Sequence, residues 1–199
     1  MSAKYHHNPE IEPASFVFTP ENLAKSAEII AKYPAGRQQS AVMPLLALAQ
    51  KQNNNWLPKI AMDYIAQMLG MQPVRVYEVA SFYTMYNLAP VGEHFVQVCT
   101  TTPCWLRGSD AIVSACEKKL GVKIGQDTAD GKFSLREVEC LGACVNAPMV
   151  QITSHSGADD FFEDLTPESM SEILDILASG NRPKTGSQSG RVSSEPAAG

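Results

Sequence analysis

Four of the five cysteines in this 199-residue chain lie in two close pairs, and paired thiolates are good ligands for soft metals. The first pair, Cys99 and Cys104, has the spacing C-x4-C, and the second, Cys140 and Cys144, has the spacing C-x3-C. Four thiolates brought together can hold one metal centre. Structural zinc sites usually draw cysteines from C-x2-C knuckles, whereas C-x4-C occurs where a loop wraps a 2Fe–2S cluster. The spacing therefore favours iron–sulfur over zinc.

The segments around the two pairs alternate in a way that predicts a small sheet with helices. Each pair lies where a predicted strand gives way to a loop, so the two loops can meet at one end of the sheet. The order β-α-β-β-β-α suits a small α/β sandwich. The predicted strands are 94–99, 133–138, 148–153 and 160–162, and the predicted helices are 108–120 and one capped by Thr166-Pro167-Glu168.

Helical patterns fill the chain before this region and predict a bundle over residues 19–88. Residues 1–18 precede it as an extended N-terminal arm. The first helix begins at Thr19-Pro20-Glu21 with an N-cap, a first-turn proline and an early acid. The other three helices are expected over 38–52 with Pro44 in the early part, from Pro58 to Gly70, and from Pro73 to about residue 83.

The remaining boundaries follow from composition. A domain over 89–180 carries all five cysteines, and no internal repeat is present. Residues 181–199 are rich in Gly, Ser, Pro and Ala with almost no apolar bulk, so we expect a disordered tail. The acidic stretch from Asp159 to Asp164 is expected to be a solvated edge or turn. The fold class is therefore α+β, with a helical bundle followed by an α/β domain.

Charge and hydropathy exclude several function classes. The net charge of −5 and the absence of a run of basic residues argue against nucleic acid or an anionic membrane surface as partner. The longest apolar stretch, 41–49, contains Pro44 and is too short to span a bilayer, so no direct membrane insertion is expected. The first residues match neither a secretory signal nor a transit peptide, which predicts a reducing cytosol where clustered thiols are more often metal ligands or redox groups than disulfides.

The second cysteine pair completes a longer motif. The motif is Asp, two residues, Phe-Ser, five residues, Cys-x-Gly-x-Cys, two residues, a small residue and Pro. It resembles the signature of the E subunit of respiratory complex I, the thioredoxin-like 2Fe–2S subunit of NADH:quinone oxidoreductases. Residues 76–86 resemble the family's helical region, and the resemblance covers about residues 15–180. The fixed positions of the motif here are Asp130, Phe133, Ser134, Cys140, Gly142, Cys144, Ala147 and Pro148.

The resemblance implies a thioredoxin-like domain with one 2Fe–2S cluster as its cofactor. Each iron would be held by one pair, Cys99 with Cys104 and Cys140 with Cys144, and Gly142 would let backbone amides approach the sulfurs. The chain would accept single electrons from the flavin of a partner subunit and would contain no catalytic residue of its own. FMN and NADH are expected on that partner, because no Gly-x-Gly-x-x-Gly or Walker A motif occurs here.

As part of complex I the chain would contact the flavin- and NADH-binding subunit and other peripheral-arm subunits. It would lie at the cytoplasmic face of a bacterial inner membrane, or at the mitochondrial matrix side. Two alternatives stay open at this point. One is the diaphorase subunit of a soluble NAD-linked hydrogenase or formate dehydrogenase, and the other is a cluster-free thiol protein or zinc-stabilised binding module.

Other chemically interesting residues have plainer interpretations. Cys116 lies between Ile112 and Leu120 on one helix face and is expected to be a buried small hydrophobic residue. Trp105 and Arg107 follow the first pair and could border the cluster, or be a packed indole and a solvated cation. The run from Phe82 to Tyr86 is expected in the core, with docking of a partner as the alternative, and the four histidines are assigned no role.

Overall fold

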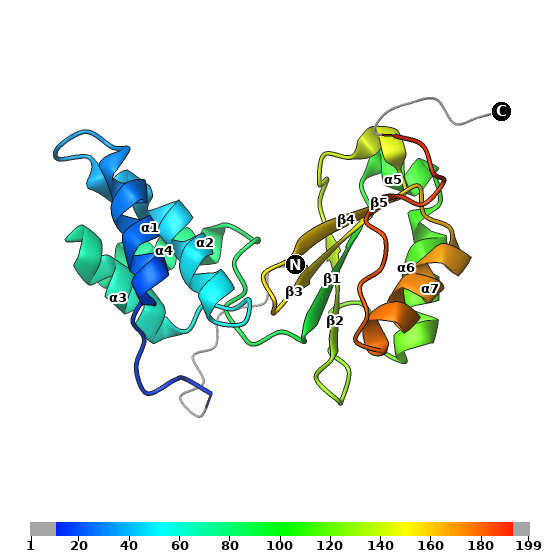
Figure 1. Cartoon of the computed structure of the whole chain (residues 1–199), viewed down its shortest axis with the longest axis horizontal. Coiled ribbons are helices and arrows are strands. Elements are labelled where there is room, and N and C mark those ends of the chain that lie inside the picture. Colours follow the sequence, from blue (N-terminus) through cyan, green and yellow to red (C-terminus); the bar gives the residue numbers. More distant parts are fainter. Residues whose placement is uncertain (1–10, 193–199) are drawn as a thin grey trace. The chain divides into compact units, whose positions relative to one another are not determined.

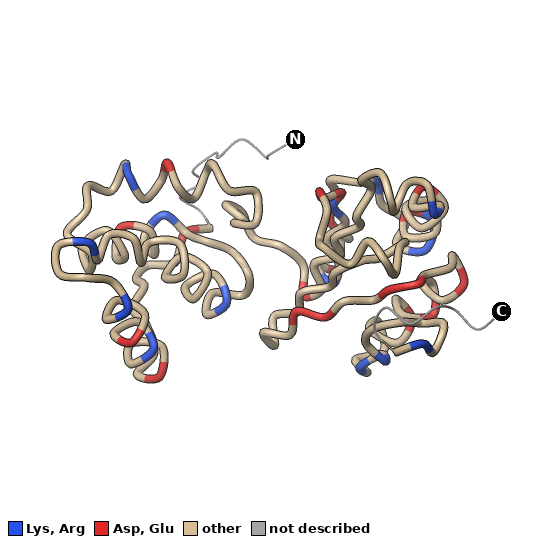
Figure 2. The backbone as a smooth tube through the Cα atoms, turned by 90° about the horizontal axis from the view of Figure 1, so that it is seen from above, with Lys and Arg blue, Asp and Glu red and all other residues tan. Residues whose placement is uncertain are grey.

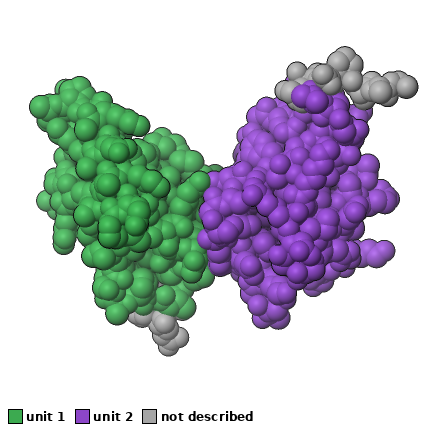
Figure 3. All heavy atoms as spheres, viewed as in Figure 1, with its two compact units in different colours: residues 1–90 green, residues 91–199 purple. Residues whose placement is uncertain are grey.

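The computed structural model describes residues 11–192, which divide into two compact units at Pro90 and Val91 (Figures 1 and 3). Unit 1 ends at Pro90 and is helical. Unit 2 begins at Val91 and contains a five-stranded sheet with its own helices. The sequence predicted a boundary between residues 88 and 89, close to this division.

Within residues 11–90, unit 1 contains four α-helices and one 3-10 turn. The Thr19 hydroxyl accepts a hydrogen bond of 3.3 Å from the amide of Asn22, so the first helix has the cap that its sequence predicts. Gly70 ends the third helix in the left-handed conformation at φ 61°, which glycine adopts without strain. The elements are α1 (Pro20–Ala31), η1 (Gln38–Ala41), α2 (Val42–Gln52), α3 (Lys59–Leu69) and α4 (Pro73–Phe82).

The single helix expected over 38–52 is divided at Ala41. Pro44 has no amide hydrogen to donate to the carbonyl of Ser40, so the α-helical ladder cannot run through this turn. Residues 38–41 form the 3-10 turn η1, and α2 begins at Val42.

The segment before α1 is extended but packed. Phe16 and Phe18 are both buried, and their rings meet Tyr64 of α3 edge to face with centroid distances of 5.7 and 5.5 Å. The Glu12 carboxylate accepts a 3.0 Å hydrogen bond from the amide of Lys59 at the start of α3. Residues 1–10 of the predicted arm lie outside the described residues.

The sheet of unit 2 has the strand order β2-β1-β3-β4-β5. The pairs β1–β2 and β4–β5 are parallel, whereas β1–β3 and β3–β4 are antiparallel. The first two strands have the bounds that the alternating pattern predicts. The strands are β1 (His94–Cys99), β2 (Phe133–Val138), β3 (Val150–Ser154), β4 (Asp159–Glu163) and β5 (Gly186–Ser187).

Two long helices, α6 (Ser109–Leu120) and α7 (Pro167–Ala178), lie side by side against the sheet (Figure 1). Thr166 and Ser169 form the capping box that begins α7. Lys119 of α6 pairs with Asp175 of α7 at 2.6 Å, although an exposed pair of this kind adds only about 0–1 kcal/mol. The apolar core between helices and sheet includes Val96, Val98, Ile112, Leu135, Ile152, Phe162, Met170 and Leu174.

Residues 181–192 are ordered against unit 2, so the expectation of a disordered tail over 181–199 is wrong for this part. Gly186 and Ser187 pair with the end of β4 as β5. Arg191 pairs with Asp164, and these two side chains are only 14% and 11% exposed. Asp164 is therefore a largely buried ion-pair partner, whereas the sequence predicted a solvated edge. Residues 193–199 lie outside the described residues.

Residues 181–192 are held in place by polar interactions with Asp164. Burial would raise the pKa of Asp164, but hydrogen bonds from Arg191 and Ser187 outweigh it and lower that pKa. The disordered tail was predicted from the low content of large apolar residues. That criterion takes no account of hydrogen bonds from several side chains to one carboxylate.

Basic and acidic residues are interspersed along the backbone of both units, as the colours of Figure 2 show. Several are paired locally, including Lys59 with Asp63 and Arg136 with Asp127. Among the described residues, no helix has the length and apolar character needed to cross a membrane.

Gly92 provides a test of how tightly β1 and β2 are joined. An added Cβ at Gly92 would lie 2.7 Å from the carbonyl carbon of Phe133. Backbone atoms of a strand cannot move aside as a flexible side chain does, so Gly92→Ala should cost about 3 kcal/mol in the free energy of unfolding. Urea unfolding followed by Trp105 fluorescence in a Trp56→Phe background measures this change.

The matched control is Gly157→Ala in the same unit. An added Cβ there meets open space, and only the φ of 86° opposes it, so the expected cost is about 1–2 kcal/mol. A loss at Gly92 no larger than the loss at Gly157 would contradict the close approach.

Candidate metal centre

The first cysteine pair lies at the end of β1. Cys99 is the last residue of the strand, and Cys104 lies in the short helix α5 (Thr102–Leu106). Both side chains are 1% exposed. The sequence predicted a loop between these cysteines. Pro103 in the first helical turn is compatible with the helix that forms instead.

The second pair lies beyond the end of β2. Cys140 is exposed, Cys144 is partly exposed and begins the 3-10 turn η2 (Cys144–Asn146), and their sulfurs are 3.2 Å apart. Gly142 between them has φ 89° and donates its amide to the sulfur of Cys140 at 3.4 Å. The expectation that Gly142 brings a backbone amide to a sulfur is therefore confirmed.

The structure brings the two pairs together. Cys99 and Cys104 pack in one small cluster with Ala147 and Met149, and Leu141 and Ala143 of the second loop lie against it. Burial, followed by a hydrogen bond with Cys99, raises the pKa of Cys104 to about 12, and the charge of Cys144 adds to the rise. The thiols of both pairs are thus close enough to influence one another electrostatically.

The exposed cysteine of the second loop behaves differently. Hydrogen bonds from Cys144 and then from Gly142 lower the pKa of Cys140. The hydrogen bond to Cys140 in turn raises the pKa of Cys144. Within residues 11–192, no three His, Cys, Asp or Glu side chains are arranged to hold a metal ion. The four thiols therefore lie as two neighbouring pairs and do not form a single compact group of three or four.

Thr101 is a residue at the site that the sequence reasoning missed. Its hydroxyl lies 3.3 Å from the sulfur of Cys99, within hydrogen-bond distance, and it also contributes to the lowered pKa of Cys140. It therefore influences one cysteine of each pair. The only signal in the sequence is its position within the C-x4-C segment.

The other candidates divide between core and surface. Cys116 is fully buried in the core of unit 2, as predicted, and burial raises its pKa to about 12. Trp105 is 57% exposed, so the interpretation as a packed indole is wrong, and Arg107 is exposed as well. Both lie within three residues of Cys104 in the chain, and both are exposed.

The aromatic run at the end of α4 is mostly surface. Phe82 is 77% exposed, and Tyr83 and Met85 are exposed too. Only Tyr86 belongs to the core, where its hydroxyl donates to the carbonyl of Met43 at 2.9 Å. The prediction of a core segment is wrong for residues 82–85, because the helix ends at Phe82 and the chain turns there.

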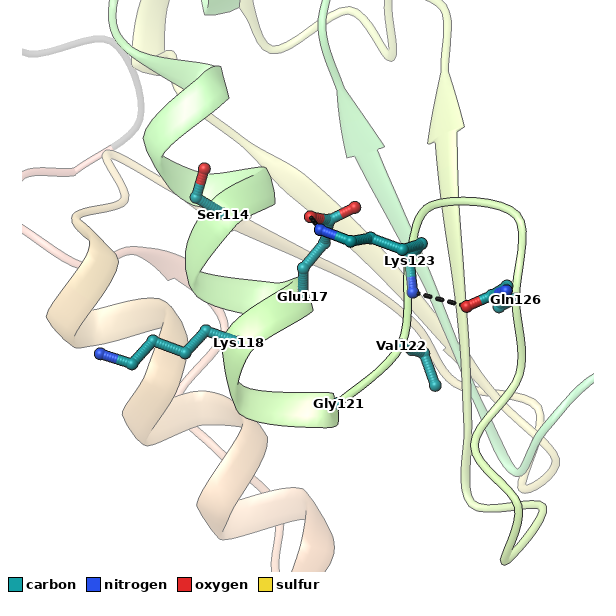
Figure 4. A pocket seen from close by; sticks show the side chains of 7 residues that line it. All are labelled: Ser114, Glu117, Lys118, Gly121, Val122, Lys123 and Gln126. Carbon is teal, nitrogen blue, oxygen red and sulfur yellow. Dashed lines mark hydrogen bonds and ion pairs between the residues drawn. The ribbon is translucent and has the colours of Figure 1, made fainter.

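Two hollows in unit 2 lie apart from the cysteine pairs. One of about 360 Å³ is open at the C-terminal end of α6, where Glu117 pairs with Lys123 and Lys123 donates its amide to Gln126 (Figure 4). The other, of about 260 Å³, is lined by the buried His94 among other residues. No cysteine lines either of these two hollows.

Comparison with known proteins agrees with the site. The profile of a family described as thioredoxin-like [2Fe-2S] ferredoxin matches residues 26–178. The chain is 58% identical over 163 residues to the E subunit of the NADH-quinone oxidoreductase of Rickettsia conorii, a match that covers 82% of this chain and 95% of the relative.

The chain belongs to the thioredoxin-like [2Fe-2S] ferredoxin family. The resemblance to the E subunit of complex I is thereby confirmed. A further relative of this ferredoxin family is the mitochondrial NADH dehydrogenase [ubiquinone] flavoprotein 2 of Dictyostelium discoideum. It is 52% identical over 184 residues, which are 92% of this chain and 72% of the relative.

A solved structure supports the same fold. An NAD+-reducing [NiFe]-hydrogenase in the air-oxidized state superposes with a TM-score of 0.58 at 16% identity. The match covers 70% of this chain and 23% of the hydrogenase chain. At this identity the likeness concerns the fold alone. The α+β class with a thioredoxin-like domain, predicted from the sequence, is confirmed by the family and the sheet.

Proposed function

We propose that this chain is the 2Fe–2S electron-transfer subunit of an NADH:quinone oxidoreductase, with Cys99, Cys104, Cys140 and Cys144 as cluster ligands. The observation that carries the proposal is that the loop of the second cysteine pair packs against the first pair, near enough for Cys144 to affect the pKa of Cys104, in a chain of the thioredoxin-like [2Fe-2S] ferredoxin family. The zinc-stabilised module loses support, because the matching family is one of iron–sulfur proteins.

The donor set fits such a cluster. It consists of four soft thiols from two segments, and the pairs are close enough for Cys99 and Cys144 to affect the pKa of Cys104. When bound, a 2Fe–2S cluster supplies one-electron transfer at a potential set by burial and hydrogen bonds to sulfur. A flavin that has taken two electrons from a hydride can release them one at a time, and a 2Fe–2S cluster would be a suitable one-electron acceptor for it.

The residues of this chain would set the environment of the cluster. Cys99 and Cys104 are buried and keep water from one side of the site, whereas Cys140 faces solvent. The Gly142 amide donates a hydrogen bond to the sulfur of Cys140, and the Thr101 hydroxyl is placed to donate one to the sulfur of Cys99. Hydrogen bonds to the ligand sulfurs would favour the reduced, more negative state of the cluster. These residues bind and tune, and none of them performs bond chemistry on a substrate.

The expected partner is the subunit that binds FMN and NADH. Without a Gly-rich nucleotide fingerprint, we expect FMN and NADH on another subunit of the same complex. Exposed Phe82, Tyr83 and Met85 on unit 1 are suited to contact with a protein partner. We expect the chain at the cytoplasmic face of a bacterial inner membrane, which its similarity to a Rickettsia NADH-quinone oxidoreductase subunit supports.

The diaphorase subunit of a soluble hydrogenase or formate dehydrogenase is the weaker alternative. Its support is a shared fold at 16% identity, whereas relatives named as NADH-quinone oxidoreductase subunits reach 58%.

The carrier role predicts no NADH oxidation by the chain alone. The purified full chain should give no NADH:ferricyanide turnover above buffer, and the activity should arise only after a flavin-bearing subunit is added. The partner alone is the control. Turnover by the pure chain would contradict the carrier role.

The ligand assignment predicts that the five cysteines divide four to one. Serine is a poor iron ligand, so serine at Cys99, Cys104, Cys140 or Cys144 should lose or distort the cluster. Cys116→Ser is the control and should keep the cluster spectrum while losing about 1–3 kcal/mol of stability, since a hydroxyl replaces a buried thiol.

Iron content and the EPR line shape of the five variants measure the division. A native spectrum in any of the four ligand variants would contradict the assignment of that residue. Loss of the cluster in Cys116→Ser with unchanged folding would show that the wrong four were chosen.

A further inference from the structure

The last described residues form a strap along one edge of unit 2. We use the name C-terminal strap for residues 181–192, which lie beyond the part that matches the family profile, 26–178. In Figure 1 the red end of this segment lies against the yellow turn η2. That turn begins with Cys144, a proposed cluster ligand.

Arg191 makes the contact between the strap and the turn. Its Nε donates to Asp164 at 2.8 Å, and its Nη2 donates to the carbonyl oxygen of Val145 at 3.0 Å. Val145 is the residue after Cys144. One guanidinium therefore joins the carboxylate at the end of β4 to the backbone next to the cysteine.

The same turn is held from the other side by β4 and the residues after it. The amide of Asp164 donates to the carbonyl of Asn146 at 2.7 Å, and the amide of Leu165 donates to that of Pro148 at 3.1 Å. The Asn146 side chain also donates to Glu163. The hydrogen bond from Arg191 to the carbonyl of Val145 completes these contacts at the exposed part of the turn, where Val145 is 68% exposed.

The Arg191–Asp164 ion pair is largely shielded from solvent. Arg191 and Asp164 are 14% and 11% exposed, and Ser187 and Ser189 of the strap also donate to Asp164 at 2.6 and 3.3 Å. Charge-assisted hydrogen bonds in such a setting are stronger than those at an exposed surface. By contrast, Arg182 in the same strap pairs with Asp160 through a side chain that is 72% exposed.

We propose that Arg191 is a positioning residue that holds the Cys140–Pro148 loop, and with it Cys144, in the conformation that binds the cluster. The proposal rests on the proposed function for its cluster. It gives the C-terminal strap, which lies beyond the residues that match the family profile, a role in positioning the cysteine loop. The competing interpretation is that the strap adds stability to unit 2 without any effect on the loop.

Three single variants of the full chain separate these interpretations. Arg191→Ala removes both contacts. Arg191→Lys keeps the charge beside Asp164 but lacks the planar fork that reaches Asp164 and Val145 together. Arg182→Ala is the matched control, since it removes an ion pair of the same strap that does not touch the loop.

The first readout is amide hydrogen exchange of peptides from 140–148 in the cluster-free protein, which does not depend on the proposed function. We expect exchange about tenfold faster in Arg191→Ala, since the charged hydrogen bond to Val145 and the link from it to Asp164 are lost. Arg191→Lys should recover the melting temperature but not the loop protection. Arg182→Ala should leave the loop unchanged.

The second readout is the rate at which a chelator removes iron from the anaerobic holoprotein, with the EPR line shape beside it. Arg191→Ala and Arg191→Lys should lose iron about tenfold faster and give broadened signals, while Arg182→Ala stays native. Unchanged exchange in 140–148, or equal effects of Arg182→Ala, would overturn the proposal. If wild type binds no iron, the proposed function fails, and the exchange result still decides the role of Arg191 in the loop.

Discussion

The parallel pairing of β1 with β2 is the constraint on which the site depends. Parallel strands end at the same edge of a sheet, so the segments that follow them emerge side by side. Cys99 is opposite Val138 in this register, and Cys140 comes two positions later in the chain. An antiparallel pairing of the same strands would send the two cysteine pairs to opposite ends. The α6 crossover between β1 and β2 is what permits the parallel arrangement.

The two sides of the site differ in exposure, and this difference bears on electron transfer. Cys99 and Cys104 are buried, whereas Cys140, Trp105 and Val145 face outward. A cluster held here would be shielded by unit 2 on one side and would be approachable on the other. Exposed apolar residues beside an open site are suited to a protein partner, since such surface is costly to leave in water. The proposed electron donor is accordingly another subunit.

Regular, local patterns were predictable from the sequence, and polar or irregular ones were not. Alternating apolar residues gave the bounds of β1 and β2, and Thr166-Pro167-Glu168 marked the start of α7. The cysteine spacing and motif gave the four proposed ligands, and in the fold the second cysteine loop packs against the first pair. The helix α5 and the division of the second helix at Ala41 were missed because one or two hydrogen bonds decide them. The strap was missed because its order depends on Arg191 and Asp164, which are distant in sequence and unremarkable in composition.

The central claim is that the four grouped thiols hold one 2Fe–2S cluster. The most direct test is iron and acid-labile sulfide analysis of the anaerobically purified full chain, with EPR after dithionite reduction. The account predicts about two irons and two sulfides per chain and a rhombic S = 1/2 signal. One tightly bound zinc per chain without labile sulfide would contradict it.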